Sequence, residues 1–309
     1  MGPLQRRLAL AALATVGLSA CGSSSSTTTA PVPVARVGSS IITQTAFQTR
    51  LQSTLTSIQQ GGGSTSNPAM QAGVRADVLR SLILDAVIAQ EAAAQGLAAT
   101  DAQVQQEVST DAQQAGGLSQ LQSELASAGG SLAQLQDEIR SQLNEQRLEN
   151  AFASQRAAQV EQTLAGGAPF TTTAMRLSDD TGTASKGGDL GALAASDLQS
   201  DDPAFVAAVK ALAVGAYTRT PVRDSGGYDI IELYGRTPAT WSVRHILVAA
   251  PLPYTVQDRP TWFSEALFSA VAQDCRAGEI HVYISDAGAD PCSGAPSLSP
   301  AALPTVPAG

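Results

Sequence analysis

The chain has 309 residues, which is enough for two modest domains, and its hydrophobic fraction of 43% is rich in Ala and Leu but poor in aromatic residues. This composition favours helices. The formal net charge is -9 and the pI is near 4.7. Because binding to nucleic acid needs a clustered positive field, this charge balance argues against a nucleic-acid partner.

The first residues predict export. Arg6-Arg7 form a positive start, residues 8–16 are apolar, and Leu18-Ser-Ala-Cys21 ends in small residues before a cysteine. This pattern resembles a bacterial lipobox. The resemblance implies that residues 1–21 are a lipoprotein signal peptide and that the lipid-modified Cys21 anchors the protein to the outer face of a membrane in the cell envelope. A plain secretory signal with an incidental cysteine is the alternative.

Residues 22–33 are rich in Ser and Thr and are expected to form a flexible tether. Two short strands should follow at residues 34–37 and 41–43, and Thr43 can cap a helix that begins near Gln44. Further apolar stripes at helical spacing predict a helical domain over residues 34–153. The expected helices start near 44, 74, 101, 118 and 132, and the last one includes Leu148.

A glycine-rich stretch, residues 186–191, organises the second half of the chain. Its adjacent glycines allow positive φ, Asp189 can tie a tight turn, and a helix should follow. Asp202-Pro203 is typical of a helix start, which predicts a helix from about 203 to 213. Residues 217–222 and 228–234 should then form two strands joined by a hairpin loop.

This half of the chain resembles the parvulin family of peptidyl-prolyl isomerases over about 80 residues. The matching positions are Ser178-Asp-Asp180, Ser185, the GGDLG sequence at 187–191, Phe205, Pro221-Val222 and Gly227-Tyr-Asp-Ile-Ile231. The resemblance implies an α+β fold, in which an antiparallel sheet is flanked by helices, and a cis-trans isomerisation of X-Pro bonds that needs no cofactor. An ordinary α+β domain with a glycine turn is the alternative.

The first half resembles the N-terminal domain of SurA- and PrsA-type foldases. Residues 37–43 with Phe47 match the opening of that domain, and residues 79–97 match its next helix and ending. The resemblance implies a chaperone domain whose partners are unfolded or proline-containing exported polypeptides. A helical bundle without a client groove is the alternative.

One strand of the parvulin pattern is displaced in the sequence. Gln155 to Leu164 and the following Gly166-Gly167-Ala-Pro-Phe170 match the family's helix, but the strand expected before them is missing. A matching strand occurs later, at residues 242–249, with Val243, His245 and Leu247 on one face. Either this strand completes the unit, as in a circular permutation, or it begins a second, decayed repeat with a helix near 263–272 and a strand near 280–284.

The parvulin resemblance implies catalytic positions. Asp180 lies where the family has a Cys or Asp near the imide, His245 matches the first family histidine, and Ser178 is a polar neighbour. Asp229 replaces the second family histidine, so the paired-histidine network cannot form as in the family and reduced activity is expected. A histidine satisfied within the sheet, without a catalytic role, is the alternative for His245.

The same resemblance places Leu198 and Phe205 in the pocket for the prolyl ring. The stretch between them is about three residues longer than the family's usual one. With only two histidines, His245 and His281, and no Cys or Glu at ligand spacing, a metal site is not expected. The sequence also lacks a nucleophile elbow and phosphate- or dinucleotide-binding glycine motifs.

The last segment, residues 251–309, contains one amphipathic helix near Trp262 to Val271 and a Pro-, Ser- and Ala-rich end. Export would allow Cys275 and Cys292 to form a disulfide, although two unpaired thiols remain the alternative.

The predicted order is therefore signal peptide (1–21), tether (22–33), helical chaperone domain (34–153), parvulin-like domain (154–250) and C-terminal helix with tail (251–309). It indicates a lipid-anchored peptidyl-prolyl isomerase and chaperone for exported proteins. Two alternatives remain open, which are a noncatalytic holdase or assembly factor and a structural envelope lipoprotein.

Overall fold

The computed structural model describes residues 32–285 and 290–293. The lipobox with Cys21 lies outside these residues, as does nearly all of the tether. Within the described residues, no helix is both long and apolar enough to cross a bilayer.

The helical part begins with a hairpin and continues as the capping residues predict. Thr43 Oγ1 accepts a hydrogen bond from Ala46 N at 3.1 Å at the start of the first helix, and Thr100 forms a reciprocal capping box with Gln103. The elements are β1 (Pro33–Val37), β2 (Ser40–Thr43), α1 (Gln44–Gln60), α2 (Pro68–Ala94), α3 (Asp101–Ala115), α4 (Leu118–Ser127) and α5 (Leu132–Ala165).

The C-terminal segment returns to this helical part. After the short helix η2 (Val256–Asp258), α9 (Thr261–Ala277) packs Phe263 against Phe152 of α5 and Ile88 of α2. β8 (Ile280–Val282) then pairs antiparallel with β1, which gives a small sheet in the order β2-β1-β8. The hypothesis of a second, decayed repeat is therefore wrong, because these elements complete the first half instead of a second sheet.

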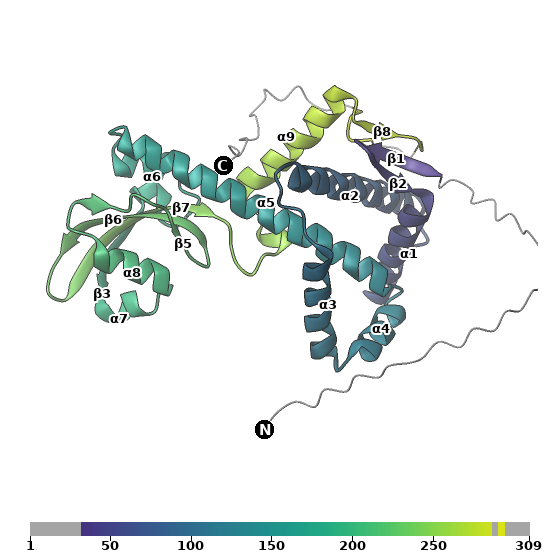
Figure 1. Cartoon of the computed structure of the whole chain (residues 1–309), viewed down its shortest axis with the longest axis horizontal. Coiled ribbons are helices and arrows are strands. Elements are labelled where there is room, and N and C mark those ends of the chain that lie inside the picture. Colours follow the sequence, from purple (N-terminus) through teal and green to yellow (C-terminus); the bar gives the residue numbers. More distant parts are fainter. Residues whose placement is uncertain (1–31, 286–289, 294–309) are drawn as a thin grey trace, which may run out of the picture. The chain divides into compact units, whose positions relative to one another are not determined.

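Helix α5 belongs to both halves of the fold. The boundary expected between 153 and 154 falls inside this helix, which continues without a break to Ala165 (Figure 1). Leu148 and Phe152 pack against α2 and α9, whereas Ala157 and Val160 pack against the large sheet. The apolar stripe of one long helix thus serves two cores.

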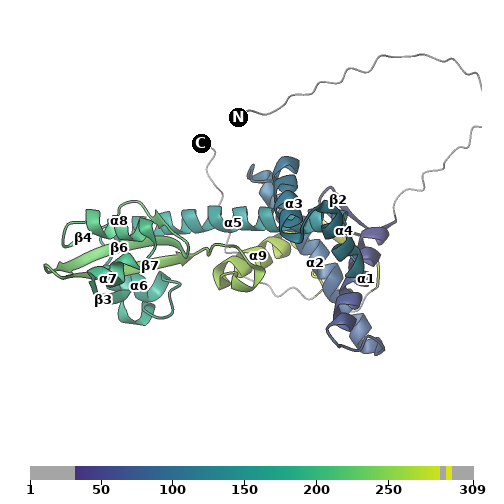
Figure 2. The ribbon, with the colours of Figure 1, turned by 90° about the horizontal axis from the view of Figure 1, so that it is seen from below.

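The large sheet contains the displaced strand at its centre. Its order is β3-β7-β6-β4, with β5 paired to β6, and all of these pairs are antiparallel (Figure 2). Strand β7, the last of these in sequence, lies between β3 and β6 and so completes the unit, as the permutation hypothesis predicts. The elements are α6 (Phe170–Leu177), η1 (Ala184–Lys186), β3 (Asp189–Ala194), α7 (Ala195–Gln199), α8 (Pro203–Ala211), β4 (Ala216–Tyr217), β5 (Val222–Arg223), β6 (Gly227–Arg236) and β7 (Thr240–Ala249).

Two local features of this sheet differ from the prediction. The turn at 186–191 leads into strand β3 rather than directly into a helix. This strand pairs with β7, where Arg244 lies opposite Asp189 and Thr240 opposite Ala194, and a pairing so distant in sequence leaves no local pattern. The strand expected over 217–222 is interrupted between β4 and β5. Pro221 in this interval has no amide hydrogen to donate to a neighbouring strand.

Helices cover both faces of the sheet. Ile230, Ile246 and Val248 face α5 and α6, whereas Ile231 and Val243 face α7 and α8. This alternation follows the period of two along each strand. The expected α+β fold, with a helical N-terminal part and an antiparallel sheet between helices, is confirmed.

Cys275 of α9 and Cys292 form a disulfide with a Cα–Cα distance of 5.3 Å. Both cysteines pack against the core that contains β1, α1 and α2. The bridge therefore ties the last described residues to the helical part.

Candidate active site

His245 lies on β7 between two carboxyl groups. Its Nδ1 is 2.8 Å from Asp229 Oδ1 on β6, and its Nε2 is 2.9 Å from Asp180 Oδ2 in the loop after α6. His245 and Asp229 are buried, at 9% and 4% exposure. The sequence correctly indicated that paired histidines cannot form here, but it missed that Asp229 can take over the hydrogen bond to His245.

The glycine motif fixes the position of His245 through the backbone. Gly188 has φ +78°, and its carbonyl oxygen accepts a hydrogen bond from His245 N at 2.9 Å. A Cβ at Gly188 would lie 2.1 Å from the carbonyl oxygen of His245. Only glycine allows the backbone at position 188 and strand β7 to approach each other this closely.

Thr183 is a site residue that the sequence analysis did not identify. Its hydroxyl donates to Asp180 Oδ2, and its Oγ1 is 3.2 Å from His245 Nε2. Asp180 Oδ1 also accepts from Gly182 N at 3.0 Å. This is an Asx-type turn, and the short spacing Asp-Thr-Gly-Thr is the signal that could have suggested it.

Ser178 supports the strand rather than touching His245. Its Oγ accepts hydrogen bonds from Leu247 N at 3.1 Å and from Asp180 N at 3.3 Å. Ser178 therefore holds Asp180 and β7 together at the point where β3 no longer pairs with β7.

A hollow of about 320 Å³ opens beside this group. Phe205 lines it and stands edge-on to the His245 ring, with centroids 6.3 Å apart. Leu198, expected to line the same pocket, is fully buried in the core that contains Phe205, and it is not among the residues that line the hollow. Leu190 and Leu193 of β3 do line it, and the sequence analysis did not identify them.

The three titratable groups hold their protons unequally. For Asp229, burial raises the pKa to about 7 despite the opposing hydrogen bond from His245. For His245, burial lowers the pKa, but the hydrogen bonds and charges of Asp229 and Asp180 outweigh it, so the pKa is raised. For Asp180, burial is outweighed by hydrogen bonds from Thr183, His245 and Gly182, so the pKa is lowered. The outer carboxyl therefore carries the charge, and the inner pair retains a proton.

These shifts predict that the protein becomes less stable as the pH rises. Raised pKa values mean that the folded state binds more protons than the unfolded state, over pH 4 to 7 for Asp229 and above pH 6.5 for His245. Burial likewise raises the pKa of Glu149 to about 7. We expect the Tm to fall by about 5–10 °C between pH 5 and pH 8.

Thermal unfolding followed by circular dichroism across this pH range would measure the change. Asp229→Asn should weaken the dependence of the Tm on pH, because the amide can still accept a hydrogen bond from His245 but does not titrate. Asp137→Asn, on the exposed face of α5, should leave that dependence unchanged. A Tm that rises between pH 5 and pH 8 would contradict the assignment.

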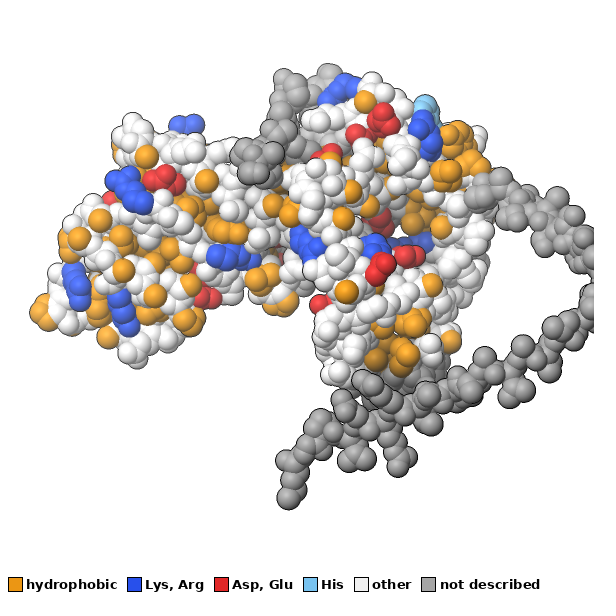
Figure 3. All heavy atoms as spheres, viewed as in Figure 1, with side chains coloured by type: hydrophobic (Ala, Val, Ile, Leu, Met, Phe, Trp, Pro, Cys, Tyr) orange, Lys and Arg blue, Asp and Glu red, His pale blue; other side chains and the backbone are white. Residues whose placement is uncertain are grey.

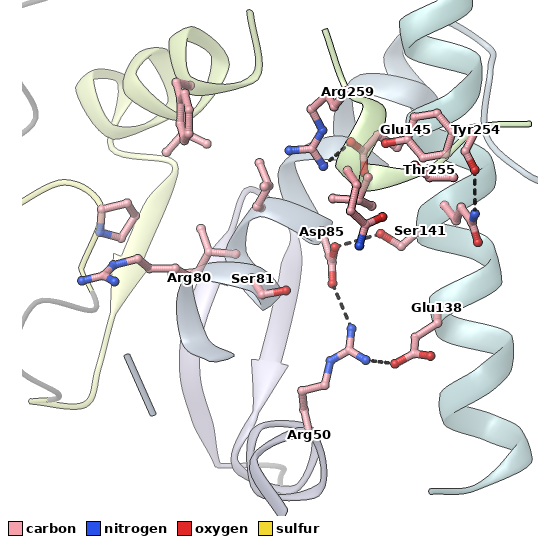
Figure 4. A pocket seen from close by; sticks show the side chains of 18 residues that line it. Arg50, Arg80, Ser81, Asp85, Glu138, Ser141, Glu145, Tyr254, Thr255 and Arg259 are labelled. Atoms are coloured by element: carbon pink, nitrogen blue, oxygen red, sulfur yellow. Dashed lines mark hydrogen bonds and ion pairs between the residues drawn. The ribbon is translucent and has the colours of Figure 1, made fainter. Parts of the chain in front are cut away.

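A second, larger hollow lies among α2, α5, α9 and the segment before α9, with a volume of about 600 Å³ (Figure 4). Arg50 forms ion pairs with Asp85, at 3.6 Å, and with Glu138, and Arg259 pairs with Glu145. The remaining walls are mostly apolar and include Ile83, Leu84, Tyr254, Phe268 and Val271.

Apolar side chains also reach the surface near this hollow. Phe268 is 62% exposed and Val256 is 52% exposed, and both line the hollow. Figure 3 shows hydrophobic side chains at the surface of the helices as well as of the sheet. Across the described residues, no group of three or more His, Cys, Asp or Glu side chains could hold a metal ion.

Comparison with known proteins separates the helical part from the sheet domain. Residues 7–149 match the family described as SurA-like N-terminal domain, and residues 138–235 match the PPIC-type PPIASE domain. The chain thus contains one segment similar to a SurA-like N-terminal domain and one similar to a PPIC-type PPIase domain. The PPIase match ends at residue 235, before β7 begins. The central strand of the sheet therefore lies outside the matched residues.

Two known proteins align with parts of this chain. The chaperone SurA of Chromohalobacter salexigens is 42% identical over 80 residues, which are 26% of this chain and 18% of that protein. The chain thus matches less than a fifth of the length of that relative. The crystal structure of the foldase PrsA of Streptococcus pneumoniae aligns over 80% of this chain and 94% of its own, with 14% identity and a TM-score of 0.29.

Proposed function

We propose that the protein is a peptidyl-prolyl cis-trans isomerase and chaperone that acts on exported polypeptides. The observation that carries the proposal is the Asp180–His245–Asp229 group beside a partly apolar hollow, in a sheet domain of which residues up to 235 match the PPIC-type PPIases. Rotation about an X-Pro bond must overcome a barrier of about 20 kcal/mol that comes from amide resonance. No covalent intermediate is needed.

The hollow supports differential binding of the twisted state. Phe205, Leu190 and Leu193 provide an apolar surface for the prolyl ring. His245 lines the hollow and can interact with the imide as conjugation is lost and its nitrogen becomes pyramidal and basic. The charged Asp180 does not line the hollow but holds His245 through Nε2. Interactions that are stronger in this state than in the planar imide lower the barrier.

The chaperone part of the proposal rests on the hollow among α2, α5 and α9. An exposed Phe268 and mostly apolar walls suit a segment of unfolded chain, and the ion pairs of Arg50 and Arg259 suit its backbone and polar groups. Location outside the cytoplasm and lipid attachment at Cys21 are part of the same proposal. They rest on the amino-terminal pattern of the sequence.

Catalysis can be tested on the chain that begins at Gly22. We expect His245→Ala and Asp180→Ala each to lower kcat/KM for isomerisation of short X-Pro peptides on the order of 10²-fold. A protease-coupled assay and line-shape NMR would measure the rates. Asp137→Ala, on the exposed surface of α5, is the matched control and should keep the parent rate.

The same proteins separate the two functions. If the site variants lose catalysis but still suppress aggregation of an unfolded client, the isomerase and chaperone roles are distinct, as proposed. If the parent chain does not accelerate isomerisation yet suppresses aggregation, the protein is the noncatalytic holdase that Asp229 in place of histidine would favour. Loss of neither property in any variant would contradict the assignment of the site.

A further inference from the structure

The hollow beside His245 has an acidic lining. Four of the residues that line it are aspartates, and none is Lys or Arg. Asp229 is buried, at 4% exposure, whereas Asp201, Asp202 and Asp224 come from the loops before α8 and before β6. The apolar and acidic parts are thus side by side in one cavity.

Two of these carboxylates are held in place by backbone amides. Asp202 Oδ1 accepts from Ala204 N at 2.9 Å and its Oδ2 accepts from Ser225 N at 3.1 Å, so it joins the start of α8 to the loop before β6. Asp224 Oδ1 accepts from the amides of Gly226 and Gly227 at 2.8 and 3.0 Å. Neither carboxylate forms an ion pair with a residue of the described chain.

Asp201 differs because no part of the described chain forms a hydrogen bond or ion pair with its carboxylate, and the residue is exposed. The cation that acts on this group of residues is Arg223, which helps to lower the pKa of Asp202. The Arg223 guanidinium is occupied by Asn150 Oδ1 at 3.1 Å and by the carbonyl oxygens of Gly227 and Ala250, each at 2.9 Å. The cation that acts on Asp202 is therefore already held by other oxygen atoms, and it forms no ion pair with the three carboxylates.

We propose that this site selects prolyl peptides with a Lys or Arg next to the proline. This inference rests on the proposed isomerase function and adds the substrate class. The apolar side of the hollow holds the prolyl ring, and the rim formed by Asp201, Asp202 and Asp224 attracts the neighbouring basic side chain. An acidic side chain at the same place is repelled, so the same charges provide discrimination in both directions.

The test is a panel of four-residue X-Pro peptides in which the residue before or after the proline is Lys, Leu or Glu. At low ionic strength we expect kcat/KM to be about tenfold higher for Lys than for Glu at one of the two positions, with Leu between them. At 1 M NaCl, where the screening length is about 3 Å, the ratio should approach one. Equal rates for Lys and Glu at both positions would overturn the inference.

Asp201 is the residue to change because it supports no turn or helix cap. Asp201→Asn should lower the Lys-to-Glu ratio about threefold and Asp201→Lys should lower it further, whereas Asp137→Asn should leave it unchanged. An unchanged ratio in Asp201→Lys would also overturn the inference. Absence of turnover for the Leu peptides would instead contradict the isomerase function itself, so the two failures are distinguishable.

Discussion

A chain that ends after Arg236 should not form the sheet domain, whereas a chain that ends after Ala250 should retain it. Strand β7 is absent from the first chain and present in the second. It provides the partner of β3 and most of the pairing of β6, from Gly227–Ala249 to Arg236–Trp241. Its loss removes buried side chains from both faces of the sheet, so the expected cost exceeds the roughly 5–15 kcal/mol by which a typical domain is stable.

Both truncated chains lack α9 and β8, so the comparison isolates the contribution of β7. Hydrogen exchange of the β6 amides and the rate of X-Pro isomerisation would measure the outcome. Protection of β6 and activity in the shorter chain would rule out the permuted arrangement. Ile246→Asp in the full chain is an independent test, because Ile246 is fully buried against α5 and α6 and an unpaired carboxylate there should unfold the sheet.

The sequence predicts this arrangement only as one of two possibilities. Alternation along 242–249 identifies a strand and its two faces, since side chains on a strand alternate with a period of two. Pairing between strands distant in sequence depends on which apolar faces fit together, and local patterns do not contain that information. The same limit explains why the sequence predicts a helix directly after the glycine turn, where β3 lies, and why it does not predict the pairing of β8 with β1.

The sequence likewise predicts the candidate site only in part. Family positions identify Asp180 and His245, and the structure brings them within 2.9 Å. From the sequence, Asp229 predicts reduced activity, because it replaces a histidine of the family pattern. The sequence does not show that the Asp229 carboxyl lies where it can form the hydrogen bond to His245. For Thr183 the Asp-Thr-Gly-Thr spacing suggests a turn, but only the folded turn shows that its hydroxyl reaches both Asp180 and His245.

Replacement of Gly188 by alanine should abolish the proposed isomerase activity and strongly destabilise the sheet. A Cβ at this position would lie 2.1 Å from the carbonyl oxygen of His245, closer than any real contact, and 3.2 Å from Ala174 Cβ of α6. Since the opposing group is backbone in the central strand, it cannot turn away as a side chain would. Relief of the clash must separate β7 from the loop and move His245 away from Asp180.

Gly191→Ala is the matched control for this prediction. Gly191 has φ +79°, almost the same as the +78° of Gly188, yet nothing lies within 4 Å of the position that a Cβ would take there. Alanine at 191 therefore costs only the strain of the left-handed backbone, about 1–2 kcal/mol, and should keep most of the activity. Alanine at 188 adds the clash, so we expect a loss of several kcal/mol in denaturant unfolding and little activity. Equal effects of the two substitutions would show that backbone conformation, and not the close contact with His245, explains the glycine motif.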